Sequence, residues 1–195
     1  MKKLFIFCSF LFLIVFAYAK SPKIVKGSFD VLKNEKYIGT TIDFSKATFD
    51  CRSLEEYLYA MNVDNDEWKE REKILCVAMN RMFAYETCKG ITLGLKEIKS
   101  TKYYLKISPL IIDINDGECD LEITLYDSSN DNVIAVATGH ADPIDHEEFL
   151  RISVAVLSNN MYVPLADKNS ANWEENIAHA FVSIGKNVLS DLLKF

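Results

Sequence analysis

The residues best suited to chemistry in this chain lie between positions 139 and 146. This segment reads Gly-His-Ala-Asp-Pro-Ile-Asp-His and holds two of the three histidines together with two carboxylates. Imidazole and carboxylate groups in proximity can bind a metal ion or move protons near neutral pH. The candidate polar site therefore consists of His140, Asp142, Asp145 and His146.

A structural role explains the same segment at least as well. Five residues separate the two histidines, which is not a standard spacing for metal ligands. Pro143 favours a turn, and Asp145 is a natural N-cap for a helix that follows. We therefore interpret the segment first as a capping loop and second as a site, and we assign no catalytic residue, metal ligand or cofactor from the sequence.

Other candidate motifs have simpler explanations. Residues 94–101 resemble a phosphate-binding loop, but Ile98 stands where the second glycine is needed, and the segment leads into a strand instead of a helix. The acidic run 113–120 departs from a calcium-binding EF-hand loop, because Glu118 takes the place of the required glycine. A hairpin turn accounts for this run, with a weak cation site as the alternative. A Gly-x-Ser-x-Gly nucleophile motif does not occur.

Residues 1–19 have the organisation of a secretory signal peptide. Two lysines precede an apolar run from Leu4 to Phe16, and Ala17-Tyr18-Ala19 fits a cleavage site. The run is too short for a membrane span of about 20 residues. We expect cleavage after Ala19 and a single domain over residues 20–195, located in the periplasm or outside the cell.

Removal of the signal peptide makes the chain more acidic. The full chain has 22 Lys and Arg against 28 Asp and Glu, and the leader contains two of the lysines. An acidic surface is repelled by phosphate groups, which disfavours nucleic acid and anionic lipid surfaces as partners. No later stretch approaches the length of a membrane span, so we expect no stable membrane insertion after processing.

Four cysteines remain after residue 19, at positions 51, 76, 88 and 119. An even number of cysteines in an exported chain is compatible with one or two disulfides. Cys51 and Cys88 are the candidates, because both lie at the ends of expected elements, but the pairing stays open. The alternative is that all four are free, because a domain of this size can fold without disulfides.

The order of the expected elements indicates an α+β fold. Three strands within residues 103–138 form an antiparallel meander, with turn signals at 115–117 and 127–132. Two long helices, over about 65–88 and 172–193, cover one face of this mainly antiparallel sheet. The remaining expected elements are a hairpin of strands 24–32 and 37–44, a helix at 54–61 capped by Ser53, a short strand at 91–95, and an undecided segment at 145–159.

The segment Tyr103–Gly139, taken together with the final helix, resembles uncharacterised secreted bacterial envelope proteins. It is more distantly similar to periplasmic α/β modules such as the TolB amino-terminal domain and the curli-assembly lipoproteins. A lipid-attachment cysteine, which the lipoproteins carry, does not follow the leader here. The resemblance implies a protein of the cell envelope that acts by contacts with other envelope proteins. It implies no catalytic residues.

Three functional hypotheses remain. The first is a non-catalytic protein–protein interaction or assembly module, which predicts exposed strand edges or an apolar patch. The second is a small-ligand or carbohydrate-binding protein, which predicts a pocket lined by some of the many aromatic residues. The third is a hydrolase, which predicts a cleft in which His140 or His146 meets a nucleophile or a carboxylate.

Overall fold

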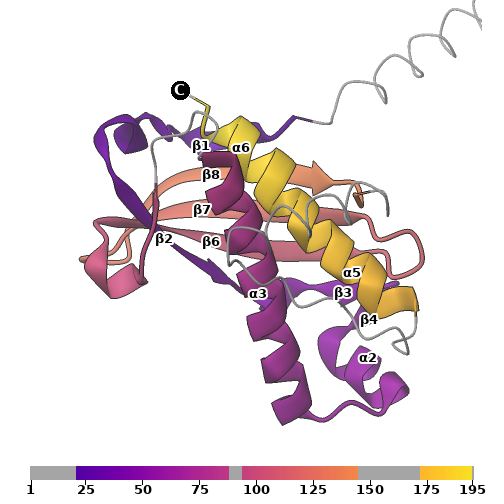
Figure 1. The fold of residues 1–195 in the computed structure, drawn as a ribbon. Helices are drawn as coiled ribbons and strands as arrows, with labels where there is room; N and C mark the ends of the chain where they lie inside the picture. The colour runs from indigo at the N-terminus through magenta and orange to yellow at the C-terminus, as the bar shows by residue number, and fades with distance from the viewer. Residues whose placement is uncertain (1–20, 88–93, 145–171, 195) are drawn as a thin grey trace, which may run out of the picture.

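A single mixed sheet covered on one face by helices forms the body of the protein. In this computed structural model, the described residues are 21–87, 94–144 and 172–194. The sheet has the strand order β1-β8-β7-β6-β2-β5, with β3 and β4 attached to β6 outside this path. Figure 1 shows α3 and the final helix lying side by side across one face. The expected α+β class is confirmed.

The centre of the sheet is the predicted antiparallel meander. Its strands are β6 (Tyr103–Ile112), β7 (Cys119–Asp127) and β8 (Val133–Ala141). Leu121, Ile123 and Leu125 alternate along β7 and are completely buried against the helices, as their spacing predicts. On β8 the same face carries small residues at 135, 137, 139 and 141, so the final helix can approach the strand closely. An alanine Cβ at Gly139 would lie 2.7 Å from Val188 Cγ1.

The predicted N-terminal hairpin is wrong. β1 (Lys23–Gly27) pairs antiparallel with β8, whereas β2 (Tyr37–Ile42) lies parallel to β6 at the other side of the meander. The chain between them forms a 3₁₀ helix, η1 (Asp30–Asn34). Phe29 and Leu32 are both buried, and residues three apart lie on the same side of a 3₁₀ turn but on opposite faces of a strand. Burial of both side chains therefore requires the chain to leave the sheet here.

The remaining strands are short and join the sheet beside β2 and β6. β3 (Thr48–Phe49) and β4 (Arg52–Ser53) pair with each other, and β5 (Gly94–Leu95) pairs parallel with β2. β5 confirms the second half of the strand predicted at 91–95. Two further 3₁₀ turns, η2 (Phe44–Lys46) and η3 (Ile98–Ser100), connect these pieces.

Both N-terminal helix predictions are confirmed. α2 (Leu54–Met61) begins with a complete capping box, in which Ser53 Oγ accepts from the Glu56 N–H and Glu56 accepts from the Ser53 N–H. α3 (Asn65–Thr87) begins after Asp64, whose Oδ1 accepts the N–H groups of Asp66 and Glu67 at 2.9 and 2.8 Å. A carboxylate at this position both caps the helix and complements its positive end.

The final helix carries the apolar stripe that the sequence predicts, but it is not a regular α-helix throughout. It consists of α5 (Asn172–Ser183), a π-helical turn η4 (Ile184–Val188) and α6 (Leu189–Leu192). The stripe residues that are described are buried: Ile177, Ala180, Phe181, Ile184, Val188 and Leu192. The π turn, which sequence spacing did not indicate, places Gly185 directly against the Met79 carbonyl of α3.

Aromatic side chains fill the core between the sheet and the helices. Trp68 of α3 lies edge-on to Phe44 at 5.2 Å and to Phe49 at 5.7 Å between ring centroids, and Phe49 stacks on Tyr57 at 4.5 Å. Phe181 of the final helix closes the group at 5.6 Å from Phe44. All five of these aromatic side chains are buried and contribute to the core.

Several predictions fall outside the described residues. These are the end of the helix predicted over about 65–88, the capping role of Asp145 and the undecided segment at 145–159. Among the described residues, no helix combines the length and apolar character that a membrane span requires.

We expect Gly185→Ala to destabilise the protein by about 1–3 kcal/mol, because its Cβ would lie 2.2 Å from the Met79 carbonyl oxygen. In a helix without this contact, the same change would stabilise by about 1 kcal/mol. Lys194→Ala, at an exposed position just after the same helix and in an exposed ion pair with Asp191, is the control and should change stability by about 0.5 kcal/mol or less. Urea unfolding followed by circular dichroism measures both; a stabilised Gly185→Ala variant would contradict the tight crossing.

Candidate functional site

Four polar side chains lie together where β7 begins and β8 ends. Asp120 and His140 are direct cross-strand partners. Glu118 lies two residues before Asp120, and Asp142 lies two residues after His140. Side chains two residues apart share a face of a strand. Their neighbours Cys119 and Ala141 are buried on the helix side. The four residues, which we call the His140 cluster, therefore lie on the face of the sheet opposite to α3 and the final helix.

Both ring nitrogens of His140 face carboxylates. Nδ1 lies 2.7 Å from Asp120 Oδ1, within hydrogen-bond distance, and Nε2 lies 3.4 Å from Asp142 Oδ1. One ligand-type atom from each of Glu118, His140 and Asp142 lies within 4.8 Å of the others. Side chains of His140 and Asp142 are 30% and 40% exposed, and Glu118 is exposed. The cluster is thus accessible from solvent.

The carboxylates determine the charge of the imidazole. Partial burial would lower the pKa of His140, but the hydrogen bond to Asp120 and the charges of Asp120, Asp142 and Glu118 outweigh it, and the pKa is raised above its usual value. The protonated ring is the form that both carboxylates favour. A raised pKa increases the share of the protonated ring, and the protonated ring does not accept a further proton.

The sequence analysis found half of this cluster. The structure brings His140 and Asp142 together, whereas Asp145 and His146 lie outside the described residues. Glu118 and Asp120 were assigned to a turn because they lie in the acidic run that begins at Asp113. The signal that links residues 118–120 to residues 140–142 is the alternation of side chains along both strands, together with the pairing register of the strands. This signal can be used only when the register is known.

The rest of the acidic run does form a turn, as predicted. Asp113 Oδ1 accepts the N–H groups of Asn115 and Asp116, and Gly117 has a φ of 73°, a conformation that favours glycine. Asp50 supports the same turn by accepting from the Ile114 N–H at 3.0 Å. These carboxylates are therefore engaged by backbone groups of the loop.

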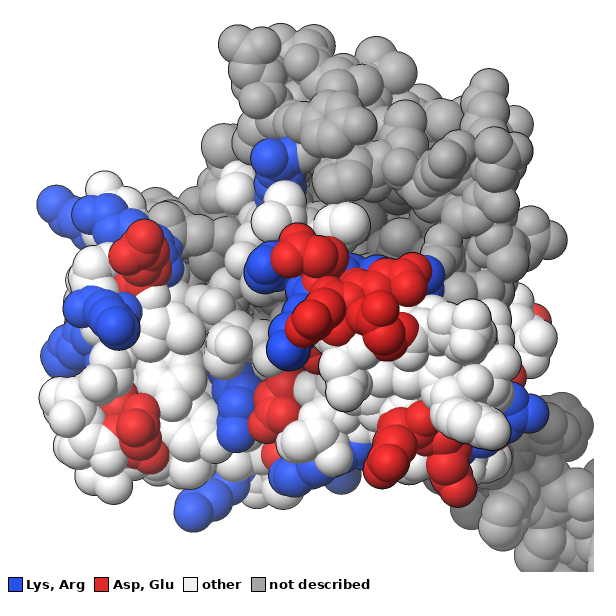
Figure 2. Space-filling view, turned by 90° about the horizontal axis from the view of Figure 1, so that it is seen from below, with Lys and Arg blue, Asp and Glu red and all other residues white. Residues whose placement is uncertain are grey.

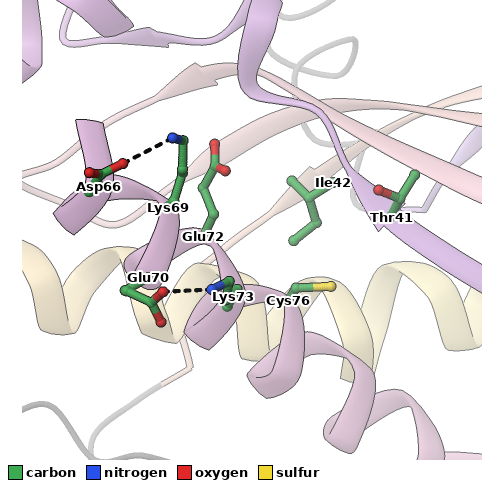
Figure 3. Close-up of a pocket in the computed structure, with 8 residues that line it drawn as sticks. All are labelled: Thr41, Ile42, Asp66, Lys69, Glu70, Glu72, Lys73 and Cys76. Carbon is green, nitrogen blue, oxygen red and sulfur yellow. Dashed lines mark hydrogen bonds and ion pairs between the residues drawn. The ribbon is translucent and has the colours of Figure 1, made fainter.

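A second concave region is a groove of about 390 Å³ between the end of β2 and the first half of α3 (Figure 3). Its lining is dominated by charged side chains, which pair along the helix: Lys69 with Asp66 at 3.0 Å and Lys73 with Glu70 at 2.5 Å. None of its lining residues is aromatic. The groove therefore lacks the apolar and aromatic lining that the ligand-binding hypothesis predicts.

Cys76 lies at one end of this groove. Burial raises the pKa of its thiol, and a hydrogen bond from Asn80 Nδ2 to Sγ offsets this in part. Asn80 also accepts a 2.6 Å hydrogen bond from Thr40 of β2, which ties the helix to the sheet. A thiol with a raised pKa is a poor nucleophile, so the residue has a packing role here.

That Cys51 and Cys88 take part in disulfides, with the pairing open, stays a prediction. Cys51 is exposed, with a positive φ of 66°, and forms no disulfide with Cys76 or Cys119. Cys88 lies outside the described residues. Cys119 is buried in β7, and burial raises the pKa of its thiol. Like Cys76, it behaves as a small apolar residue.

Surface charge is mixed in the described part of the chain. Figure 2, which views the molecule from the end where α3 begins, shows a group of acidic side chains with basic side chains beside it. The first turns of α3 carry Asp66, Glu67 and Glu70, which pair with Lys69, Arg71 and Lys73. Ion pairs between exposed groups such as these contribute little to stability.

Comparisons with known proteins yield structural similarity alone. No model of a protein family matches the sequence, and no curated protein matches it. Among solved structures, the PelC dodecamer from Paraburkholderia phytofirmans is 13% identical, with a TM-score of 0.36 over 88% of this chain and 97% of that chain. A variant of the same PelC dodecamer is 11% identical, with a TM-score of 0.37 over 89% and 98%. Similarity at this level does not bear on function.

We expect NMR titration of the metal-free protein to give His140 a pKa above 6.5, and Asp120→Asn to lower it. A raised folded-state pKa means that the stabilising contribution of the protonated ring is complete below the unfolded pKa of about 6.5. It is then lost as the pH rises through the folded pKa. The stability advantage of wild type over Asp120→Asn should therefore shrink with rising pH in urea unfolding. A His140 pKa at or below 6.5 would contradict the geometry of the cluster.

Proposed function

We propose that this chain is an exported protein of the bacterial cell envelope that acts as a non-catalytic interaction or assembly module. The observation that carries the proposal is the edge strand β1. All five of its residues are exposed, including Ile24 at 50% and Val25 at 61%. Two adjacent apolar residues exposed on a sheet edge favour contact with another protein.

The outer edge of β1 has the hydrogen-bonding groups that a partner strand needs. Among the described residues β1 pairs with β8 alone, and so its other edge has no strand beside it. An extended peptide can add to such an edge through main-chain hydrogen bonds, with side chains providing specificity. This is the form of interaction that we propose for the module.

Charge indicates the chemistry of the partner. Lys23 lies opposite Thr138 of β8, and Lys26 lies opposite Val136. Thr138 and Val136 share a face of β8 because they are two residues apart. The bulge at Val25 between them places both lysines on this one face. A partner segment with acidic side chains would complement them. Pairing of two β1 strands would instead bring lysines together, which disfavours self-association through this edge.

The other two hypotheses receive less support. The groove beside Cys76 has a charged lining without aromatic residues, which does not favour a carbohydrate site. Among the described residues, the two ring nitrogens of His140 face Asp120 and Asp142, so the ring meets a carboxylate, as the hydrolase hypothesis predicts, but faces no hydroxyl or thiol nucleophile. Partner identity and oligomeric state are left to experiment.

We expect the protein isolated from its native cell to begin at Lys20. The two lysines, the apolar run and the Ala17-Tyr18-Ala19 site direct export and cleavage at this point. Amino-terminal sequencing of protein from the periplasmic or extracellular fraction measures this. Replacing Ala19 with Arg should block processing and leave the precursor in the membrane fraction. A cytosolic protein that retains Met1 would overturn the export proposal.

We expect a photo-crosslinking residue at Val25 to capture a partner from the cell envelope in living cells. Replacing both Lys23 and Lys26 with Glu should lower the captured amount at least about tenfold, because like charges then oppose an acidic segment. The same crosslinker at Ser129, an exposed turn residue, is the matched control. Equal capture at both positions, or capture unaffected by charge reversal, would contradict the proposed edge.

A further inference from the structure

We propose that Glu118, His140 and Asp142 bind a divalent transition-metal ion of the Zn²⁺ class, with Asp120 as the residue that orients the imidazole. The three ligands offer one nitrogen and two carboxylate groups within 4.8 Å of one another. Imidazole and carboxylate ligands together suit Zn²⁺ and related ions. None of these residues belongs to the interaction edge on β1.

Distances within the cluster agree with a shared ion. Zn²⁺ binds histidine nitrogen and carboxylate oxygen at about 2.0–2.2 Å, so two ligands of a tetrahedral site lie about 3.4 Å apart. Nε2 of His140 and Oδ1 of Asp142 are 3.4 Å apart. This separation is long for a hydrogen bond but matches a ligand pair. Glu118 is exposed, and one of its carboxylate oxygens lies within 4.8 Å of the ligand atoms of both residues.

Asp120 prepares the imidazole for this role. It accepts a hydrogen bond from Nδ1 at 2.7 Å, which leaves Nε2 to face Glu118 and Asp142 when the ring is neutral. A carboxylate that holds the second ring nitrogen of a ligating histidine is a regular feature of metal sites, where it fixes the tautomer and raises the basicity of the ligand. The direct pairing of Asp120 and His140 in the sheet register holds the two in place.

The charge of the cluster favours a cation. Three carboxylates surround one imidazole, so the cluster stays negative even when His140 is protonated. Glu118 and Asp142 lie just beyond the last pair of β7 and β8, and their carboxylates approach within 4.8 Å, which is unfavourable unless a positive charge lies nearby. In the strand register Lys23 lies opposite Thr138, which is two residues before His140 on β8. Lys46 forms an ion pair with Glu122 at 3.6 Å. A divalent ion would neutralise the cluster directly.

The imidazole also predicts which ions bind. Ca²⁺ and Mg²⁺ favour sites made entirely of oxygen ligands, whereas a nitrogen ligand favours first-row transition metals. Three protein ligands leave at least one position for water or for a side chain of a partner. We therefore expect Zn²⁺ to bind much more tightly than Ca²⁺.

Isothermal titration of the mature chain, freed of metal with EDTA, tests this with ZnCl₂ and CaCl₂ at pH 7.5. We expect Zn²⁺ binding that His140→Gln and Asp142→Asn each abolish, and that Asp120→Asn weakens about 10- to 100-fold. Asp116→Asn, in the neighbouring turn and outside the cluster, is the matched control and should leave the affinity unchanged. Circular dichroism confirms that each variant is folded.

The proposal is overturned by three results. These are no Zn²⁺ binding, binding that survives His140→Gln in a folded protein, and equal affinity for Ca²⁺ and Zn²⁺. In each case the cluster would be an ion pair between His140 and its carboxylates. Because β1 is tested separately, such a result would leave the proposed interaction edge intact.

Discussion

The rest of the structure depends on one constraint. Alternate side chains of β6, β7 and β8 pack against α3 and the final helix. A strand has a side-chain period of two, so a shift of one residue would move every buried side chain to the opposite face. Burial of Leu121, Ile123 and Leu125 therefore determines the register of β7. The same register places Asp120 opposite His140 on the other face. The polar cluster is thus a consequence of how the core packs.

The crossing of the two helices over this sheet depends on small residues. Gly139 lets Val188 approach β8, and Gly185 lets the π turn of the final helix contact the Met79 carbonyl of α3. Ile184 and Val188, the first and last residues of this π turn, are both buried. The close approach of helix, helix and strand keeps the carboxyl end of β8 in place. His140 and Asp142 lie at this end.

Sequence reasoning predicted the elements whose signals are local. The meander has turn residues and strict alternation, α2 and α3 have capping side chains, and the final helix has an apolar stripe, so each could be located from its own residues. The hairpin of strands 24–32 and 37–44 was wrong because Phe29 and Leu32 are buried by residues distant in the sequence. For the same reason Glu118 and Asp120 were read as part of a turn. Their link to His140 is a pairing across strands, which one sequence without its register does not contain.

Both proposals concern parts of one sheet, and the register relates them. Lys23 and Lys26 of β1 lie beside Thr138 and Val136 on β8, on the same face as His140. This face therefore has positive charge along its β1 edge and negative charge at the end of the β7–β8 pair. An acidic segment that adds to β1 would extend past Lys23 toward the carboxylates of the His140 cluster, where like charges oppose each other. A divalent ion bound there would remove that repulsion, and its open coordination position could accept a carboxylate of the added segment. Metal binding would then strengthen partner binding, and linkage requires that the partner strengthen metal binding by the same factor.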